Sequence, residues 1–162
     1  MTTKQQKPKE QIDTVVIRFA GDSGDGMQLT GNQFTENTAI FGNDLTTLPD
    51  FPAEIRAPAG SLFGVSSFQI KFSKDEVHTP GDDPDVLVSM NPAALKVHLC
   101  DLKKHGTIII NTANFTPKNL KLAEWGEDPL EDNTLDDYRV IKIDMNKLVF
   151  NALDDMDLSS KI

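Results

Sequence analysis

The sequence contains very little cysteine, with Cys100 as the only one among 162 residues. One thiol can neither close an internal disulfide nor supply the four thiolates that usually hold an iron–sulfur cluster. We therefore expect no cluster in this chain, and a reducing, cytoplasmic environment. We interpret Cys100 as a small buried filler of the core.

Long apolar runs are also missing. No uninterrupted apolar stretch approaches the roughly 20 residues that a helix needs to span a bilayer. The start, MTTKQQKPKEQ, is polar and lacks the apolar centre of a signal peptide. We expect residues 1–13 to form a flexible tail, and we expect no membrane partner.

Positive charge is scarce as well, since 16 Lys and Arg stand against 25 Asp and Glu and the formal net charge is −9. Proteins that bind nucleic acid contact its phosphates through clustered cations. The charge balance therefore argues against a nucleic-acid partner. With 38% hydrophobic and 25% charged residues, the composition suits one globular domain.

Strand-like segments alternate with helix-like segments along the chain. Runs of β-branched and apolar residues at 14–19, 86–88 and 107–110 predict buried strands, with further strands at 44–48 and 138–143. This alternation predicts an α/β fold: a three-layer, Rossmann-like, mostly parallel sheet with helices on both faces. Sheets of this kind bind ligands beyond the carboxyl ends of their strands.

Two helices have clear signals. Met27, Phe34 and Phe41 recur every seven residues and predict a helix over 27–41. A second helix opens at Pro92 and ends before Gly106, and its apolar stripe consists of Leu95, Leu99 and Leu102.

The remaining segments are less regular. In the stretch 62–72, apolar Phe68 and Ile70 alternate with polar neighbours such as Gln69, which predicts a strand with one solvated face. The acidic segment 124–137 is expected to be irregular. A further helix is predicted over 146–153, close to the last residue, so we expect the domain to be incomplete at its C-terminus.

The glycine-rich turn 21-GDSGDG-26 follows the first predicted strand directly. Glycines permit positive φ, and free N–H groups at the start of the next helix attract phosphate or carboxylate. Gly21, Ser23, Gly24 and Gly26 are therefore candidates for binding a pyrophosphate or carboxylate. A tight turn without a ligand is the alternative, because neighbouring aspartates would repel an anion unless they point away or cap the helix.

The triplet Gly24-Asp25-Gly26 also resembles the motif in which an aspartate holds the magnesium of thiamine diphosphate. That motif has an asparagine about 25 to 30 residues later, which shares the metal. Here the segment 49-PDFPAE-54 contains no asparagine, and Asn43 lies only 18 positions beyond Asp25. We therefore assign no thiamine or metal role to this turn.

Three longer stretches together resemble a known family: 17-IRFAGDSGDGMQLTGNQF-34, 51-FPAEIRAPAGSLFGVSSFQIKF-72 and 86-VLVSMNPAALK-96. They are similar to the gamma domain of 2-oxoacid:ferredoxin oxidoreductases, as found in the N-terminal part of the alpha subunit of the 2-oxoglutarate type. The resemblance covers roughly residues 14 to 150. It implies that residues 14–162 form a gamma domain that lacks its last part.

The resemblance also implies a function. The family oxidatively decarboxylates a 2-oxo acid with coenzyme A, forming an acyl-coenzyme A and CO2 and passing electrons to ferredoxin. It implies that thiamine diphosphate, magnesium and the iron–sulfur cluster belong to the remaining alpha-subunit domains and the beta subunit. The gamma domain would then support assembly and coenzyme A handling without catalytic residues of its own. A free-standing nucleotide- or partner-binding α/β module remains the alternative.

Two further residues are candidates for cofactor binding. Arg56 is predicted to share one side of an extended backbone with Glu54, where it could clamp a coenzyme phosphate, pair with Glu54 or cross a subunit boundary. Asn91 follows a strand and precedes a helix, so it could bind the polar edge of a cofactor or cap the helix. The three histidines have no metal-type spacing, and we assign them no catalytic role.

Overall fold

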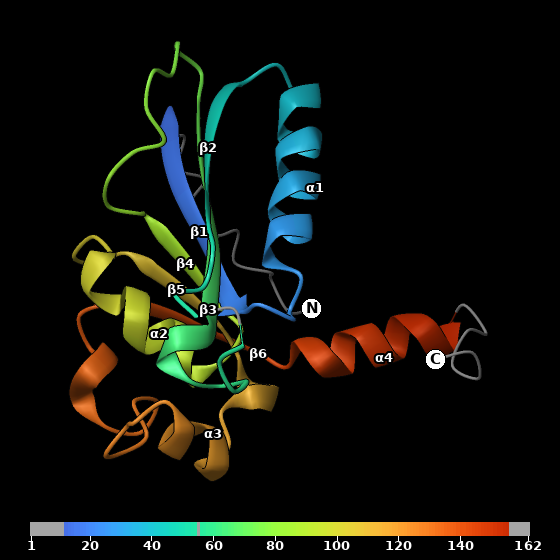
Figure 1. The fold of residues 1–162 in the computed structure, drawn as a ribbon. Coiled ribbons are helices and arrows are strands. Elements are labelled where there is room, and N and C mark those ends of the chain that lie inside the picture. The colour runs from blue at the N-terminus through green and yellow to red at the C-terminus, as the bar shows by residue number, and fades with distance from the viewer. Residues whose placement is uncertain (1–11, 55, 156–162) are drawn as a thin grey trace, which may run out of the picture.

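The computed structural model describes residues 12–54 and 56–155, and residues 1–11 of the predicted tail lie outside that part. Within it, strands β1 to β6 form one sheet in the order β2-β3-β1-β4-β5-β6 (Figure 1). The strands and helices are β1 Thr14–Asp22, α1 Met27–Ile40, β2 Asp44–Asp50, β3 Val65–Ser73, β4 Val86–Ser89, α2 Pro92–His98, β5 Thr107–Asn111, α3 Pro117–Leu122, β6 Arg139–Ile143 and α4 Met145–Asp155.

The predicted mostly parallel α/β sheet is confirmed. β1 pairs with β4, β4 with β5 and β5 with β6 in parallel, whereas β3 is antiparallel to both β1 and β2. Helices α1 and α2 lie on opposite faces of the sheet (Figure 1). The carboxyl ends of β1, β4 and β5 consequently meet at one edge.

Two apolar layers hold the helices to the sheet. On the α1 face, the Phe34 ring lies 5.3 Å from Phe19 and 6.2 Å from Phe72 between ring centroids. On the α2 face, Leu87, Leu95 and Ile108 are completely buried. The predicted α1 stripe is correct for Met27 and Phe34 but wrong for Phe41, which is 82% exposed because α1 ends at Ile40 and the chain turns away at Gly42, where φ is 78°.

The prediction of a solvated face for β3 is wrong. Gln69 is 2% exposed, and both ends of its side-chain amide form hydrogen bonds. Oε1 accepts from Arg18 Nε, and Nε2 donates to the Pro80 and Gly81 carbonyls at 3.0 and 2.8 Å. β3 lies inside the sheet between β2 and β1, and the loop before β4 covers this face. A polar side chain buried in this way must be hydrogen-bonded, and Gln69 is.

The second predicted helix is shorter than expected. α2 ends at His98, a 3-10 turn covers Leu99–Asp101, and Leu102 has extended backbone although its side chain remains buried. Cys100 lies on this turn and is exposed, so its assignment to the core is wrong.

Helix α3 was not predicted, although its start has a local signal. Thr116 caps it by accepting from Asn119 N, and Pro117 occupies its first turn. The segment 124–137 is irregular as expected, apart from a 3-10 turn at Asn133–Leu135.

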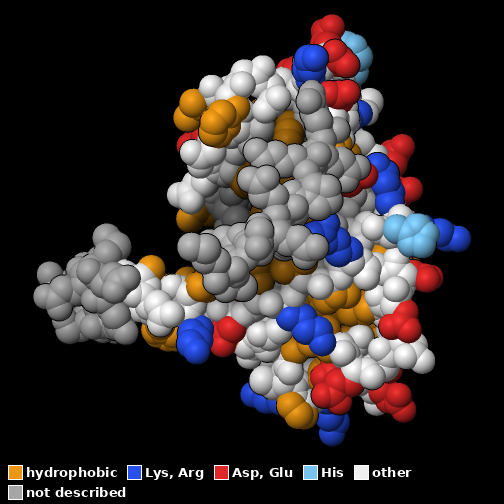
Figure 2. Space-filling view, turned by 180° about the vertical axis from the view of Figure 1, so that it is seen from behind, with side chains coloured by type: hydrophobic (Ala, Val, Ile, Leu, Met, Phe, Trp, Pro, Cys, Tyr) orange, Lys and Arg blue, Asp and Glu red, His pale blue; other side chains and the backbone are white. Residues whose placement is uncertain are grey.

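Helix α4 projects from the body of the domain (Figure 1). Leu148, Val149 and Phe150 are each more than half exposed, and apolar side chains are visible along this projection in the space-filling view (Figure 2). In the described part of the chain, no helix is both long and apolar enough to cross a membrane.

Candidate functional site

A polar cavity of about 280 Å³ opens where β1, β4 and β5 end, and we call it the carboxyl-edge pocket. This is the position at which parallel α/β sheets bind ligands. The lining comes from the glycine turn, from residues 49–60, which we call the proline-rich segment, and from the segments that follow β4 and β5. The lining residues are Asp22, Asp25, Ala59, Gly60, Asn91, Asn114, Lys118, Asn119 and Leu122.

The local structure favours glycine at two positions of the turn. A Cβ at Gly21 would lie 2.7 Å from Asp25 Oδ2 and 3.1 Å from Met90 Cβ. Gly26 is the N-cap of α1 and has φ of 73°, a left-handed conformation that side chains disfavour. Gly24 differs, because in the described structure a Cβ there would have no neighbour within 4 Å. Packing among the described residues therefore does not explain a glycine at position 24.

The two aspartates of the turn hold local structure. Asp25 Oδ2 accepts from Asp22 N, and Asp22 Oδ2 accepts from Gly60 N, both at 2.8 Å. Neither side chain caps α1. The Asp22–Gly60 bond ties the turn to the proline-rich segment, and Ser23 N adds a bond to the Gly64 carbonyl at 3.1 Å.

Asp22 is the electrostatically unusual residue of this pocket. Its Oδ1 is buried and has no hydrogen-bond partner among the described residues. Burial raises the pKa of Asp22, and the charge of Asp25 adds to the rise, whereas the Gly60 N–H and the Asn91 side chain oppose it. A ligand group that donates a hydrogen bond would satisfy Oδ1.

Three asparagines contribute side-chain amides to the lining of the pocket. Asn91 caps α2 as one predicted alternative had it, with Oδ1 accepting from Ala94 N at 2.9 Å. Asn114 Nδ2 donates to the Met90 carbonyl at 2.9 Å, and Asn119 Nδ2 donates to the Asn114 carbonyl at 2.8 Å. The lining contains one cation, Lys118, and two carboxylates, so it favours polar groups that both donate and accept over a bare anion.

Sequence reasoning missed Asn114, Lys118 and Asn119. A signal for Asn114 was available, because it follows β5 much as Asn91 follows β4. Lys118 and Asn119 line the pocket because they lie on α3, and α3 was not predicted.

The structure brings together only part of the predicted site. Asn91 and the glycine turn meet at the carboxyl-edge pocket, but Arg56 does not line it. The backbone around Arg56 is a turn in which Ala57 N donates to the Glu54 carbonyl, so the extended arrangement of Glu54 and Arg56 is wrong. Arg56 is exposed and forms no ion pair with any described carboxylate. Within the described residues, no cluster of three or more His, Cys, Asp or Glu could hold a metal ion.

Fold and pocket define an α/β domain that presents a polar site at the carboxyl edge of a parallel sheet. The family model for pyruvate ferredoxin/flavodoxin oxidoreductase matches residues 16–157. The chain therefore belongs to the pyruvate ferredoxin/flavodoxin oxidoreductase family, as its sequence motifs implied.

One relative within this family is similar to nearly the whole chain. The chain is 52% identical over 153 residues to the 2-oxoglutarate oxidoreductase subunit KorA of Mycobacterium tuberculosis. The match covers 94% of this chain but only 23% of that subunit, so the chain spans about a quarter of its relative's length.

Two solved structures share the fold. The 2-oxoglutarate:ferredoxin oxidoreductase of Magnetococcus marinus, with 2-oxoglutarate, coenzyme A and succinyl-CoA bound, matches with a TM-score of 0.65 and 21% identity, over 85% of this chain and 21% of that one. The gamma subunit of a keto/oxoacid ferredoxin oxidoreductase from Geobacter sulfurreducens PCA matches with a TM-score of 0.60 and 17% identity, over 88% and 67% of the two chains.

Proposed function

We propose that residues 14–162 are the gamma-type domain of a 2-oxoglutarate:ferredoxin oxidoreductase. The complete enzyme would oxidatively decarboxylate a 2-oxo acid with coenzyme A, releasing an acyl-coenzyme A and CO2 and passing electrons to ferredoxin. The observation that carries this proposal is the 52% identity to a 2-oxoglutarate oxidoreductase subunit across nearly the whole chain.

The redox chemistry would be supplied by other parts of the complex. Cys100 is exposed and is the only cysteine of the sequence, so this chain alone lacks the ligands of an iron–sulfur cluster. Thiamine diphosphate, magnesium and the cluster are accordingly assigned to the remaining alpha-subunit domains and the beta subunit, which would be the partners of this domain.

The domain's own role would be to support assembly and to handle coenzyme A at the carboxyl-edge pocket. The pantetheine arm of coenzyme A carries amides and a hydroxyl, which donate and accept hydrogen bonds as the asparagines and Asp22 Oδ1 require. Lys118 supplies a cation for phosphate, and the missing side chain of Gly24 leaves room for close approach to the turn.

The proposal can be tested on the full-length alpha and beta subunits expressed together. We expect Lys118→Ala and Gly24→Val each to raise KM for coenzyme A about tenfold, the equivalent of about 1.4 kcal/mol of binding. KM for 2-oxoglutarate and kcat should not change. Lys104→Ala removes an exposed lysine elsewhere and is the matched control.

Two results would count against the proposal at different levels. An unchanged KM for coenzyme A in both the Lys118 and the Gly24 variant would remove the coenzyme A role but leave the domain as a part of the enzyme. If deletion of residues 14–155 left coenzyme-A-dependent ferredoxin reduction undiminished, the whole proposal would fail.

A further inference from the structure

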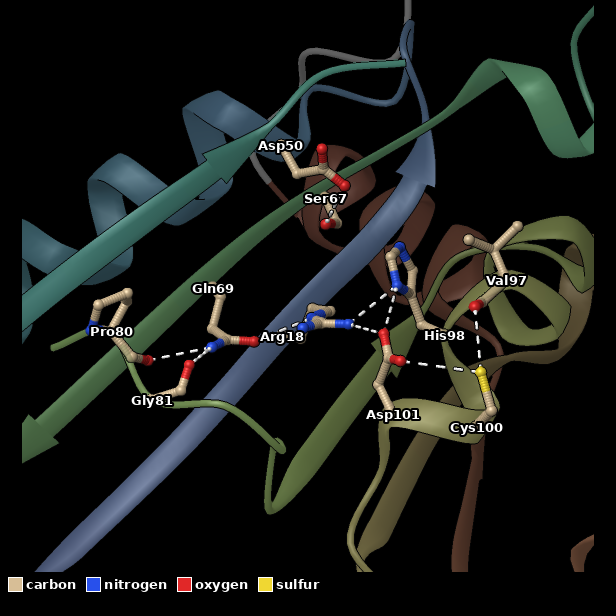
Figure 3. Close-up of polar contacts among 10 residues, drawn as sticks. All are labelled: Arg18, Asp50, Ser67, Gln69, Pro80, Gly81, Val97, His98, Cys100 and Asp101. Atoms are coloured by element: carbon tan, nitrogen blue, oxygen red, sulfur yellow. Dashed lines mark hydrogen bonds and ion pairs between the residues drawn. The ribbon is translucent and has the colours of Figure 1, made fainter. Parts of the chain in front are cut away.

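A second cavity, of about 240 Å³, lies on the α2 side of the sheet, between β1, β2, β3 and the end of α2. We call it the Arg18–His98 pocket (Figure 3). It shares no lining residue with the carboxyl-edge pocket. Its polar walls come from segments distant in sequence, since Arg18 lies on β1 and Asp101 follows α2.

The hydrogen bonds of Arg18 determine which nitrogen of His98 carries the proton. Arg18 Nη1 lies 3.0 Å from His98 Nδ1 and also donates to Asp101 Oδ2. Nδ1 also lies 3.5 Å from Asp101 Oδ2, which is the longer of its two contacts. A guanidinium can only donate and approaches Nδ1 more closely, so we assign Nδ1 as the acceptor and place the ring proton of neutral His98 on Nε2. Burial, and then the charge of Arg18, lower the pKa of His98, which keeps the ring neutral near pH 7.

The Nε2–H group of His98 has no acceptor among the described residues, although it is buried. The side chain of His98 is 7% exposed. Figure 3 shows this nitrogen on the side of the ring away from Asp101, facing the part of the pocket where Asp50 and Ser67 lie. Buried donors in folded proteins almost always have a partner, so this donor indicates a group that enters the pocket from elsewhere.

The charges around the pocket restrict that group. The positive charge of Arg18 is neutralised by the ion pair with Asp101, so the net charge of the pocket lining is the negative charge of the Asp50 carboxylate. Asp50 is exposed, and its Oδ2 accepts from Ser67 Oγ at 3.3 Å. An incoming carboxylate or phosphate would be repelled by Asp50. A neutral carboxamide fits, because its oxygen can accept from His98 Nε2–H and its N–H can donate to Asp50.

The surroundings favour a polypeptide as the source of the carboxamide. In the described sheet β2 is the end strand, so one of its edges is unpaired. Leu48 lines the pocket and is 46% exposed, and Phe51, one residue after Asp50, is 67% exposed. A polypeptide segment can cover this apolar surface while its amide fills the pocket, whereas a small amide would leave the surface in water.

We propose that the Arg18–His98 pocket receives a carboxamide, from a main chain or from an Asn or Gln side chain, of another polypeptide segment in the assembled oxidoreductase. This inference rests on the proposed function, under which the chain is one domain of a larger complex. The relative's length supports such a partner, because this chain spans only 23% of it.

Photo-cross-linking in the purified complex of full-length subunits tests the inference. With p-benzoylphenylalanine in place of Leu48, we expect irradiation and mass spectrometry to identify one segment, outside residues 12–155, whose cross-link includes or adjoins an accessible amide. Asp50→Ala in the same protein should reduce the yield at least fivefold. Asp50→Asn, which keeps an acceptor oxygen, should retain most of it.

The role of His98 as a hydrogen-bond donor is tested by the same cross-linking experiment with the probe at Leu48. His98→Phe removes the donor and should reduce the yield, while His98→Gln keeps an N–H group and should retain more of it. The probe placed at Glu76, an exposed acidic position away from the pocket, is the matched control and should not label the same segment. The inference is overturned if the probe at Leu48 labels no other segment, or if Asp50→Ala leaves the yield unchanged.

Failure of this inference can be told apart from failure of the proposed function. Ferredoxin reduction by the wild-type complex is measured on the same preparation. If the complex is active but shows no cross-link, the inference about what occupies the pocket is overturned and the proposed function is not. A complex that shows the cross-link but never oxidises a 2-oxo acid overturns the proposed function only.

Discussion

The ring of Phe68 in β3 lies directly against Gly31 of α1. A Cβ at Gly31 would lie 2.2 Å from both Cγ and Cδ1 of Phe68, and 2.8 Å from its Cβ. The absence of a side chain at position 31 thus lets the helix approach the sheet closely. Phe68 is 3% exposed and lies inside the sheet, so it has little room to move.

Replacing Gly31 with alanine is expected to destabilise the protein. Alanine is a better helix former than glycine by about 1 kcal/mol, but overpacking typically costs about 1–3 kcal/mol, and here the clash involves atoms close to the Phe68 backbone. With the overpacking cost at its upper end of about 3 kcal/mol, we expect a net loss of about 2 kcal/mol in the free energy of unfolding, measured by urea denaturation. Gly24→Ala, where no atom lies within 4 Å, should change it by less than about 0.5 kcal/mol. A Gly31→Ala protein as stable as wild type would contradict this packing.

The buried His98 is expected to make stability fall in mild acid. Its pKa is lowered below the ordinary 6.5, first by burial and then by Arg18. The unfolded chain therefore binds a proton as the pH falls through 6.5, while the folded chain does not until the pH is lower. Stability is consequently lost as the pH decreases below 6.5. Thermal unfolding between pH 7.5 and 5.5 should show this slope, and His98→Gln should flatten it; an identical slope in the variant would exclude His98 as its source.

Asp22 is expected to have the opposite dependence. Burial raises its pKa above 3.8, so the folded state holds this proton more tightly than the unfolded state, and stability is lost as the pH rises through the raised pKa. Asp22→Asn keeps an oxygen that can accept from Gly60 N but carries no charge. We expect a higher melting temperature than wild type at pH 7, and a difference that shrinks toward pH 3.8. Asp136→Asn, an exposed change, is the control, and a lower melting temperature for Asp22→Asn at pH 7 would contradict the prediction.

Asn111 is expected to anchor the projecting helix α4. It is completely buried at the end of β5, its Oδ1 accepts from Met145 N, and its Nδ2 donates to Asn146 Oδ1, both at 3.1 Å. Asn111→Ala should remove both hydrogen bonds to the start of α4, at a cost of about 1–3 kcal/mol. Hydrogen exchange should then accelerate across residues 145–155 while β1 and β4 stay protected. Asn37→Ala on α1 is the matched control, and unchanged protection of α4 in the Asn111 variant would disprove the anchor.

Local features of the sequence predicted much of the fold. The apolar runs located β1, β4 and β5, and the seven-residue recurrence from Met27 located α1. These elements could be predicted because the spacing of apolar residues along a short stretch of sequence indicates a helix or a strand. The helix start at Asn91 and Pro92 was recognised from residue type, because proline suits the first turn of a helix and asparagine can cap it. The glycine turn was also found, but the reason for Gly21 depends on atoms such as Met90 Cβ, and the reason for Gly26 is its φ of 73° at the start of α1. Neither could be read from the motif.

The errors have separate physical origins. Gln69 was assigned to a solvated face because alternation shows which side chains share a face but not what covers that face, and the loop before β4 covers it. Cys100 was assigned to the core because a free cysteine is usually a small buried residue, whereas here it lies on the exposed 3-10 turn Leu99–Asp101 after α2. Residue type and alternation alone do not show which parts of a surface other segments cover.

By itself, the sequence determined the alternation of strands and helices, the family motifs and the position of the glycine turn, since all of these depend on residues near one another in the chain. Only the tertiary structure decided which polar groups meet. Arg18 reaches Asp101 across 83 positions, and Asp22 reaches Gly60 across 38. Such pairs depend on how strands are ordered in the sheet and how loops close over its edge, and hydrophobic periodicity carries no information about either.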